Sequence, residues 1–149
     1  MIQLLRADSG NSDFIELVRQ LDVELAQRDG DEHPFYAQFN KIDKIRHVVV
    51  AYDDGQPAGC GAIKEYAPGV MEIKRMFTRP QNRGRGIASK VLRELETWAG
   101  ELAYKKCILE TGKKQEEAIG LYRKSGYVLI PNYGQYEGVE NSVCFEREF

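Results

Sequence analysis

The chain of 149 residues has a formal net charge of −2, with 42% hydrophobic and 30% charged residues. This length suits one domain with a single core, and the composition is that of a globular chain rather than a disordered one. The charge balance gives no overall attraction to nucleic acid or to an anionic membrane, and no apolar run approaches the roughly 20 residues of a membrane span. We therefore expect a cytoplasmic protein in which residues 1–149 form a single domain.

Apolar periodicity and turn residues predict alternating strands and helices along the chain. In chain order we expect a strand at 2–7, a helix that ends near 28–31, a short segment of helical pattern at 33–42, two strands within 46–66 joined by a turn at Asp54-Gly55, a strand at 70–78, a helix after Gly86, a strand at 105–111, a helix at 115–126, and strands at 127–131 and 142–149. Strands 70–78 and 105–111 are joined by a crossover helix, so they should lie parallel and close. The order predicts an α/β fold with a mixed sheet covered by helices.

The segment PQNRGRGIASKVL at 80–92 places glycines and arginines where a helix begins. Glycine is a poor helix former, and arginines oppose the positive end of the helix dipole. Gly84 and Gly86, however, remove side chains that would keep an anion away from the free amides of the helix start. Between Lys74 and Arg93 the chain has seven basic residues and no acidic one. We interpret the segment as a polyphosphate site in which the ligand supplies the missing negative charge.

Other classes of site fit the residues less well. A Walker A loop is excluded because no Gly-Lys-Ser/Thr follows the glycines, and a dinucleotide fingerprint needs a glycine at the position of Ser89. A plain strand-to-helix turn with solvated arginines and an RNA-binding RGG-like segment remain as alternatives. The three cysteines form no CxxC pair and the two histidines have no ligand spacing, so we expect buried thiols and no metal site.

Two motifs stand out in the chain: Gln81-x-x-Gly84-x-Gly86 between a strand and an amphipathic helix, and EAIGLYRKSGY at 117–127. Together they resemble the GCN5-related N-acetyltransferase (GNAT) family, whose later helix has the pattern Ala-x-x-x-Tyr-x-x-x-Gly-Phe/Tyr. The resemblance covers essentially the whole chain. It implies the acyl-CoA N-acyltransferase fold, with a mixed, mostly antiparallel sheet of about seven strands, flanking helices and a parallel central strand pair. It also implies an acetyl-CoA-dependent N-acetyltransferase in which a primary amine attacks directly within a ternary complex.

The resemblance also implies which residues bind the cosubstrate acetyl-CoA. The end of strand 70–78 should hold the pantetheine arm, the glycine turn and the following helix should hold the pyrophosphate, and Gln115 stands where the family commonly has an Asn. The residues expected to bind are Met76, Phe77, Thr78, Gln81, Asn82, Arg83, Gly84, Arg85, Gly86, Ala88, Ser89, Gln115 and Tyr122.

Tyr122 and Glu72 are the residues that we expect to take part in proton transfer. An alkylamine is mostly protonated at pH 7 and must lose a proton before attack, whereas the departing thiolate gains from a donor. The resemblance places Tyr122 beside the sulfur as that donor, and Glu72 is the best candidate for the base. Strand alternation puts Glu72 on the same face as Met76, although the carboxylate could equally pair with Lys74 or Arg75. An N–H near Phe77 should meet the oxyanion that forms during transfer.

The acceptor site should come from the least patterned segments. Carboxylates beside aromatic rings suit a cationic amine, and two segments combine them. Their residues are Asp29, Asp31, Glu32, Phe35 and Tyr36 in the first, and Tyr133, Tyr136, Glu137 and Glu140 in the second. We expect an amine acceptor that is a small molecule or a peptide, with no nucleic acid or membrane partner, and a homodimer that pairs through an exposed last strand. A non-catalytic acyl-CoA sensor and a nucleic-acid module that uses the basic run 74–93 are the alternatives.

Overall fold

The computed structural model describes residues 1–30 and 45–149. Its elements are β1 (Ile2–Ala7), α1 (Ser12–Asp29), β2 (His47–Asp53), β3 (Gln56–Ala67), β4 (Val70–Thr78), η2 (Pro80–Asn82), α3 (Ile87–Glu101), β5 (Lys106–Gly112), α4 (Glu116–Lys124), β6 (Val128–Ile130), η3 (Gly134–Tyr136) and β7 (Ser142–Glu148). The strands form a seven-stranded sheet in the order β1-β2-β3-β4-β5-β7-β6. The predicted elements are confirmed in this part of the chain, whereas the segment 33–42 lies outside the described residues.

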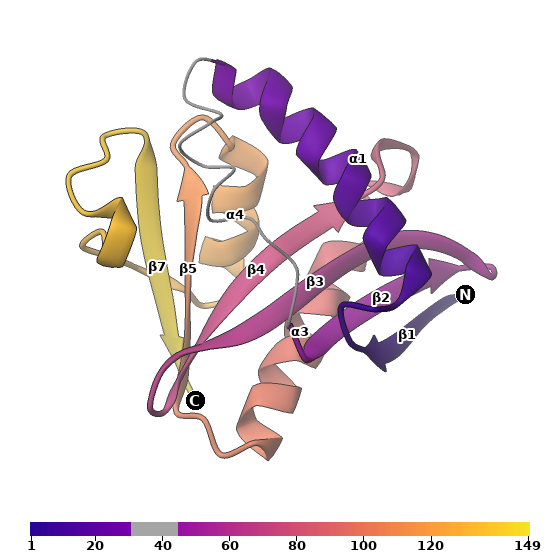
Figure 1. The fold of residues 1–149 in the computed structure, drawn as a ribbon, viewed down its shortest axis with the longest axis horizontal. Coiled ribbons are helices and arrows are strands. Elements are labelled where there is room, and N and C mark those ends of the chain that lie inside the picture. Colours follow the sequence, from indigo (N-terminus) through magenta and orange to yellow (C-terminus); the bar gives the residue numbers. More distant parts are fainter. Residues whose placement is uncertain (31–44) are drawn as a thin grey trace. The chain divides into compact units, whose positions relative to one another are not determined.

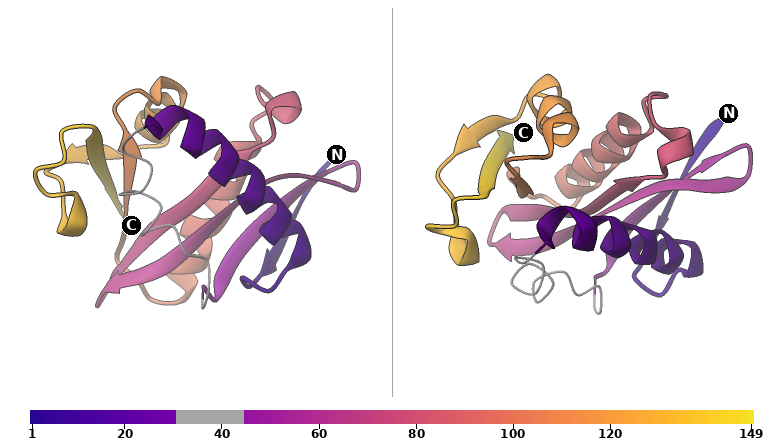
Figure 2. Two further views of the ribbon diagram at one scale, coloured as in Figure 1. Left: turned by 45° about the horizontal axis from the view of Figure 1, so that its top comes forward. Right: turned by 90° about the horizontal axis from the view of Figure 1, so that it is seen from above.

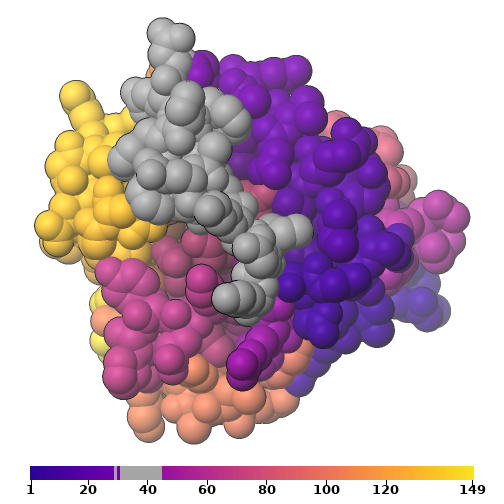
Figure 3. Space-filling view, viewed as in Figure 1, coloured from indigo at the N-terminus to yellow at the C-terminus, as the bar shows by residue number. Residues whose placement is uncertain are grey.

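The chain divides into two compact units. Unit 1 comprises Met1–Lys64 and Lys74–Leu95, and unit 2 comprises Glu65–Ile73 and Glu96–Phe149. In unit 1, helix α1 lies across the strands β2 and β3 (Figure 1), and its outward side is visible in the space-filling view (Figure 3). The buried side chains that join α1 to these strands are Phe14, Leu17, Val18, Leu21, Val48, Val50, Cys60 and Ala62. Each large one contributes roughly 1.5–3 kcal/mol through burial.

The start of α1 is fixed by a side-chain cap. The Asn11 carboxamide oxygen accepts a hydrogen bond from the Phe14 amide at 2.9 Å. This satisfies one of the amides that a helix start leaves without a partner. The apolar spacing that predicted the helix is therefore supported by a local start signal.

The opposite face of β3 packs on α3, as the view from above shows (Figure 2). A Cβ on Gly61 would lie 2.5 Å from Met76 Sδ, 2.9 Å from Leu95 Cδ1 and 3.0 Å from Val91 Cγ1. Real side chains do not approach this closely, so glycine at this position lets α3 settle on the strand. Unit 1 is thus a sheet segment between two helices.

Unit 2 is built around β5. Strand β5 pairs antiparallel with β7 from Lys106↔Glu148 to Gly112↔Ser142. The start of β4 pairs in parallel with β5 from Val70↔Lys106 to Glu72↔Ile108. The predicted parallel pair is confirmed. The expectation that the last strand is an exposed edge is wrong, because β7 lies between β5 and β6 and pairs with both.

Strand β4 contains one residue in the left-handed region, Arg75. This residue has φ +58° although it is not a glycine, a conformation that costs about 1–3 kcal/mol. Beyond it the predicted alternation holds, because Phe77 is buried against α1 and Met76 faces α3. Before it Met71, Glu72 and Ile73 are all buried. The prediction that Glu72 shares a face with Met76 therefore loses its basis, since it assumed a continuous extended strand.

Candidate active site

The glycine turn forms an open approach to the start of α3. Gly84 and Gly86 have φ +83° and +77°, and a Cβ on either would meet no atom of the described residues within 4 Å. The amide of Lys90 donates to the Gly86 carbonyl at 3.1 Å, which marks the first helical hydrogen bond. The amides before it have no intrahelical acceptor and carry the positive end of the helix dipole. This geometry fits an anionic group such as a pyrophosphate.

The short helix η2, which the sequence did not predict, reduces the number of backbone amides that could donate to a bound anion. In η2 the Asn82 amide donates to the Arg79 carbonyl at 2.9 Å, and the Arg83 amide donates to the Pro80 carbonyl at 3.3 Å. These two amides are therefore engaged within the turn. The backbone donors best placed for a ligand begin at Gly84.

The arginines of the turn pair with acidic residues of unit 1. The Arg83 guanidinium contacts both carboxylate oxygens of Glu24 at 3.1 and 2.9 Å, and Arg85 Nη1 lies 2.6 Å from Asp53 Oδ2. Arg75 pairs in the same way with Asp22 of α1 at 2.5 Å. The sequence interpretation that a ligand supplies all the missing negative charge is corrected here, because α1 and β2 supply much of it.

Other predicted cosubstrate residues of unit 1 lie at the end of β4, in η2 and at the start of α3. Gln81 and Ser89 are exposed and Ala88 is half-buried at the start of α3. At the end of β4, the Thr78 carbonyl accepts a hydrogen bond from Arg83 Nε at 2.9 Å. The turn and the strand end are thus joined by the side chain of Arg83.

In unit 2, Tyr122 is buried on α4. Its ring lies edge-on to Tyr127, with centroids 5.8 Å apart, and tilted against Phe145 at 6.5 Å. Burial raises the pKa of the Tyr122 hydroxyl above its ordinary value, and the Glu110 carboxylate raises it further. The hydroxyl therefore keeps its proton at neutral pH. Gln115 is half-buried and stands at the N-cap of this helix.

Glu72 has a partner that the sequence did not indicate. The Tyr133 hydroxyl donates to Glu72 Oε2 at 2.6 Å, and Glu72 is only 8% exposed. Burial raises the pKa of Tyr133, and the charge and hydrogen bond of Glu72 raise it further. Tyr133 belongs to the segment expected to bind the acceptor, so the structure joins the predicted base to that segment.

Glu110 is a second carboxylate in unit 2 that sequence reasoning missed. It lies on β5, accepts a hydrogen bond from Ser142 Oγ at 2.7 Å, and contributes to the raised pKa values of both Tyr122 and Tyr136 after burial itself. An acidic residue near the end of a central, otherwise apolar strand is the signal that could have revealed it.

The expected acceptor segments differ in what the structure describes. Asp31, Glu32, Phe35 and Tyr36 lie outside the described residues, and Asp29 is the last residue of α1. In the second segment Tyr136 is buried, whereas Glu137 and Glu140 are exposed. In the second segment an aromatic ring is therefore buried, and these two carboxylates face solvent.

The cysteines are free and buried, as predicted. Burial raises the pKa of Cys60 and Cys107 to about 12 and that of Cys144 to about 11, so none of them is a thiolate at neutral pH. Within residues 1–30 and 45–149 no group of three or more His, Cys, Asp or Glu side chains is placed to hold a metal ion. No helix in the same ranges is long and apolar enough to cross a membrane.

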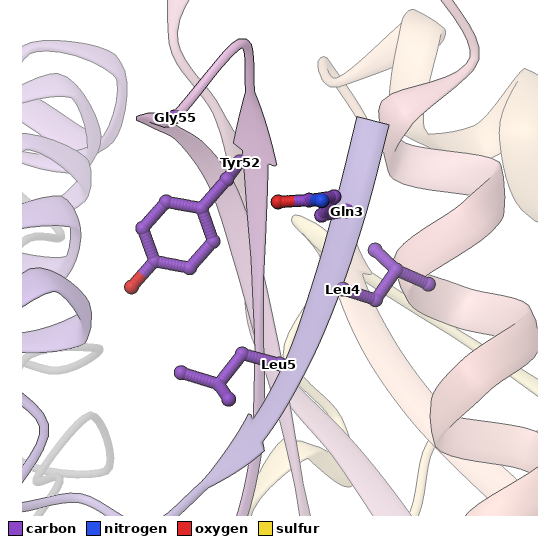
Figure 4. A pocket seen from close by; sticks show the side chains of 5 residues that line it. All are labelled: Gln3, Leu4, Leu5, Tyr52 and Gly55. Carbon is purple, nitrogen blue, oxygen red and sulfur yellow. The ribbon is translucent and has the colours of Figure 1, made fainter. Parts of the chain in front are cut away.

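A shallow depression of about 650 Å³ lies beside β1 (Figure 4). Its lining residues are Gln3, Leu4, Leu5, Tyr52 and Gly55. The Tyr52 hydroxyl donates to Asp13 at 2.6 Å, and burial, followed by this hydrogen bond, raises its pKa to about 12. The depression contains none of the predicted site residues.

The comparisons with known proteins agree with this geometry. A solved structure from Klebsiella pneumoniae, provisionally assigned as an acyl-CoA N-acyltransferase, has a TM-score of 0.82 and 29% identity, and the match covers 99% of this chain and 97% of that one. The PaiA N-acetyltransferase of Thermoplasma acidophilum, solved with coenzyme A, shares the fold with a TM-score of 0.73 at 16% identity, over 100% and 99% of the two chains. The sheet, the parallel strand pair and the glycine turn thus define an acyl-CoA N-acyltransferase fold.

Sequence relatives make the assignment specific. A relative from Azospirillum brasilense named IAA acetyltransferase is 33% identical over 141 residues, which are 89% of this chain and 88% of the relative. The uncharacterized N-acetyltransferase YsnE of Bacillus subtilis is 34% identical over 113 residues, 72% of this chain and 75% of its own. Residues 14–127 match the acetyltransferase (GNAT) family, and the chain belongs to it. It is an acetyl-CoA-dependent N-acetyltransferase with an amine-bearing acceptor.

Proposed function

We propose that the pyrophosphate of acetyl-CoA binds at the start of α3. The observation that carries this proposal is the pair of left-handed glycines, Gly84 and Gly86, whose missing side chains leave the helix amides open to an anion. The amides from Gly84 to Ala88 are its donors, with Gln81, Ser89 and the exposed side of Arg85 around them. Arg83 acts by holding the turn against Thr78 and α1, and Asn82 by shaping η2.

The pantetheine arm is proposed to follow the backbone of Met76, Phe77 and Thr78. Gln115 and Tyr122 on α4 complete the set of residues that contact the cosubstrate. Acetyl-CoA supplies the activated thioester acyl group. The match to the family runs from 14 to 127 and includes parts of both units, which supports a single domain that acts as a whole.

Glu72 is proposed to act as the general base of the transfer, and Tyr122 as the hydrogen-bond donor to the leaving thiolate. Glu72 takes a proton from the acceptor ammonium, which frees the nitrogen lone pair for direct attack. Tyr122 keeps its proton because burial raises the pKa of its hydroxyl, so it donates a hydrogen bond to the charge that develops on sulfur. General acid–base groups of this kind contribute about 10²–10⁴-fold each. The acceptor is a primary amine of a small molecule or of a peptide.

A thiol-release assay tests the function. The purified protein is incubated with acetyl-CoA and a panel of small amines, amino acids and lysine-containing peptides, and free coenzyme A is titrated with a thiol reagent. Release that depends on one acceptor class supports the proposal and identifies that class. Acetyl-CoA binding without release on any amine would instead indicate an acyl-CoA sensor.

A further inference from the structure

We propose that Tyr133 is a positioning residue for Glu72, and that the pair adapts the enzyme to acceptors that arrive as alkylammonium ions. This inference rests on the proposed function, in which Glu72 is the base. Tyr133 comes from the segment between β6 and β7, outside the two motifs that carry the family resemblance.

The hydrogen bond between the two residues has one direction. The Tyr133 hydroxyl lies 2.6 Å from Glu72 Oε2, and Glu72 is 8% exposed. Because burial and the nearby carboxylate keep the phenol protonated, the tyrosine donates and the glutamate accepts. A charge-assisted hydrogen bond of this kind fixes the carboxylate in one orientation inside the protein. Tyr133 therefore orients the carboxylate of Glu72 and does not act as a base itself.

The segment that carries Tyr133 is itself held in place. The Asn132 side chain donates to the carbonyls of Val139 and Ser142 at 3.1 and 3.0 Å. The Tyr136 amide donates to the Tyr133 carbonyl at 2.9 Å, which closes the η3 turn. These hydrogen bonds give the segment a defined shape, so the position of the Tyr133 hydroxyl is preset before an acceptor binds.

The ring of Tyr133 is also wedged between two other tyrosines. Tyr66 contacts it edge-on with centroids 5.0 Å apart, and Tyr136 does so at 5.8 Å. Gly134 beside this cluster has φ +53°, which favours glycine, and a Cβ there would lie 2.8 Å from the Tyr66 hydroxyl. Removal of the Tyr133 hydroxyl alone should leave these ring contacts intact, which makes a phenylalanine variant a clean test.

The charges near the pair favour a cation. Tyr133 and Tyr136 lie near Glu72 and stay neutral at pH 7, because burial raises the pKa of each. The Cys144 thiol also lies near Glu72, and burial raises its pKa to about 11. Glu110 adds a second carboxylate that acts on Tyr136. An alkylammonium ion therefore meets negative charge, and its N–H bond breaks as Glu72 takes the proton and nitrogen keeps the electron pair.

The test compares Tyr133→Phe with the matched control Tyr104→Phe. The control removes another tyrosine–glutamate hydrogen bond of unit 2, from Tyr104 to Glu65 at 2.6 Å. Each variant is assayed with the primary alkylamine found in the thiol-release screen and with an analogue that carries three fluorine atoms on the carbon β to nitrogen, which is mostly unprotonated at pH 7. Acetyl-CoA affinity is measured in parallel.

We expect Tyr133→Phe to lower kcat for the alkylamine by about 10-fold or more, and Glu72→Gln by about 10²-fold or more. Both should lose far less with the fluorinated amine, while acetyl-CoA affinity and the control stay at wild-type values. Unchanged kcat in a folded Tyr133→Phe protein would overturn the proposal. An equal loss with both amines would also overturn it, because it would indicate a merely structural role. If Tyr133→Phe does not fold, the amine dependence of Glu72→Gln decides. Failure of the wild-type protein on every amine would refute the proposed function itself.

Discussion

Replacement of Gly86 by alanine separates backbone strain from ligand binding. At φ +77° an alanine pays about 1–2 kcal/mol in a left-handed conformation, yet its Cβ meets no described atom within 4 Å. For a chain of this size, such a loss lowers Tm by roughly 2–8 °C. The variant should therefore fold. In the proposed site, however, its methyl group would occupy the space from which a phosphate approaches the helix amides.

The expected loss of affinity follows from the hydrogen bonds displaced. A hydrogen bond between an amide and a charged group is worth about 1.5–3 kcal/mol, so loss of one raises the Kd for acetyl-CoA roughly 10- to 100-fold. The matched control is Gly138→Ala, because Gly138 has φ +75° and the same open surroundings. Calorimetric titration and thermal unfolding of both variants give the two quantities. Wild-type affinity for acetyl-CoA in a folded Gly86→Ala protein, with the same loss of Tm as Gly138→Ala, would refute the reasoning.

Three further predictions concern other parts of the chain. Tyr122→Phe should lower kcat at least 10-fold with little change in the Kd for acetyl-CoA; equal turnover would remove Tyr122 from the mechanism. Gly59→Ala should destabilise the protein by roughly 1–3 kcal/mol in urea unfolding, because its Cβ would lie 2.8 Å from the Phe77 carbonyl oxygen; unchanged stability would contradict this packing. Hydrogen bonds from Arg19 and Gln20 lower the pKa of Glu16 from 4.5 to about 2, so their stabilisation is present above pH 4.5 and is lost as pH falls toward 2. The Glu16→Gln variant should therefore lose less Tm than the wild-type protein as the pH falls from 4.5 to 2. An identical fall in Tm for both proteins would contradict a stabilising role of these hydrogen bonds.

Local patterns predicted most of the fold because they act over short distances. The apolar face of α1 and the turn at Asp54-Gly55 depend on neighbours in sequence. Both turn residues have positive φ, +50° and +83°, as a tight hairpin of this type requires. The turn at Gly84 and Gly86 between β4 and α3 was predicted for the same reason. Strand order was less accessible, since the position of β7 between β5 and β6 depends on long-range pairing.

The site was harder to predict where residues meet across long separations. Glu24 and Arg83 are 59 positions apart, and Glu72 and Tyr133 are 61 apart. No periodicity connects such pairs, so the acidic partners of the basic turn and the partner of Glu72 emerged only from the structure. The left-handed Arg75 was equally hidden, because its sequence is that of an ordinary strand.

The most direct test of the account is a calorimetric titration of the wild-type protein with acetyl-CoA, repeated with Gly86→Ala. We predict saturable binding of one acetyl-CoA per chain, with weaker binding in the variant although both proteins are folded. Absence of binding to the folded wild-type protein would contradict the assignment of the glycine turn at 84–86 as the pyrophosphate site.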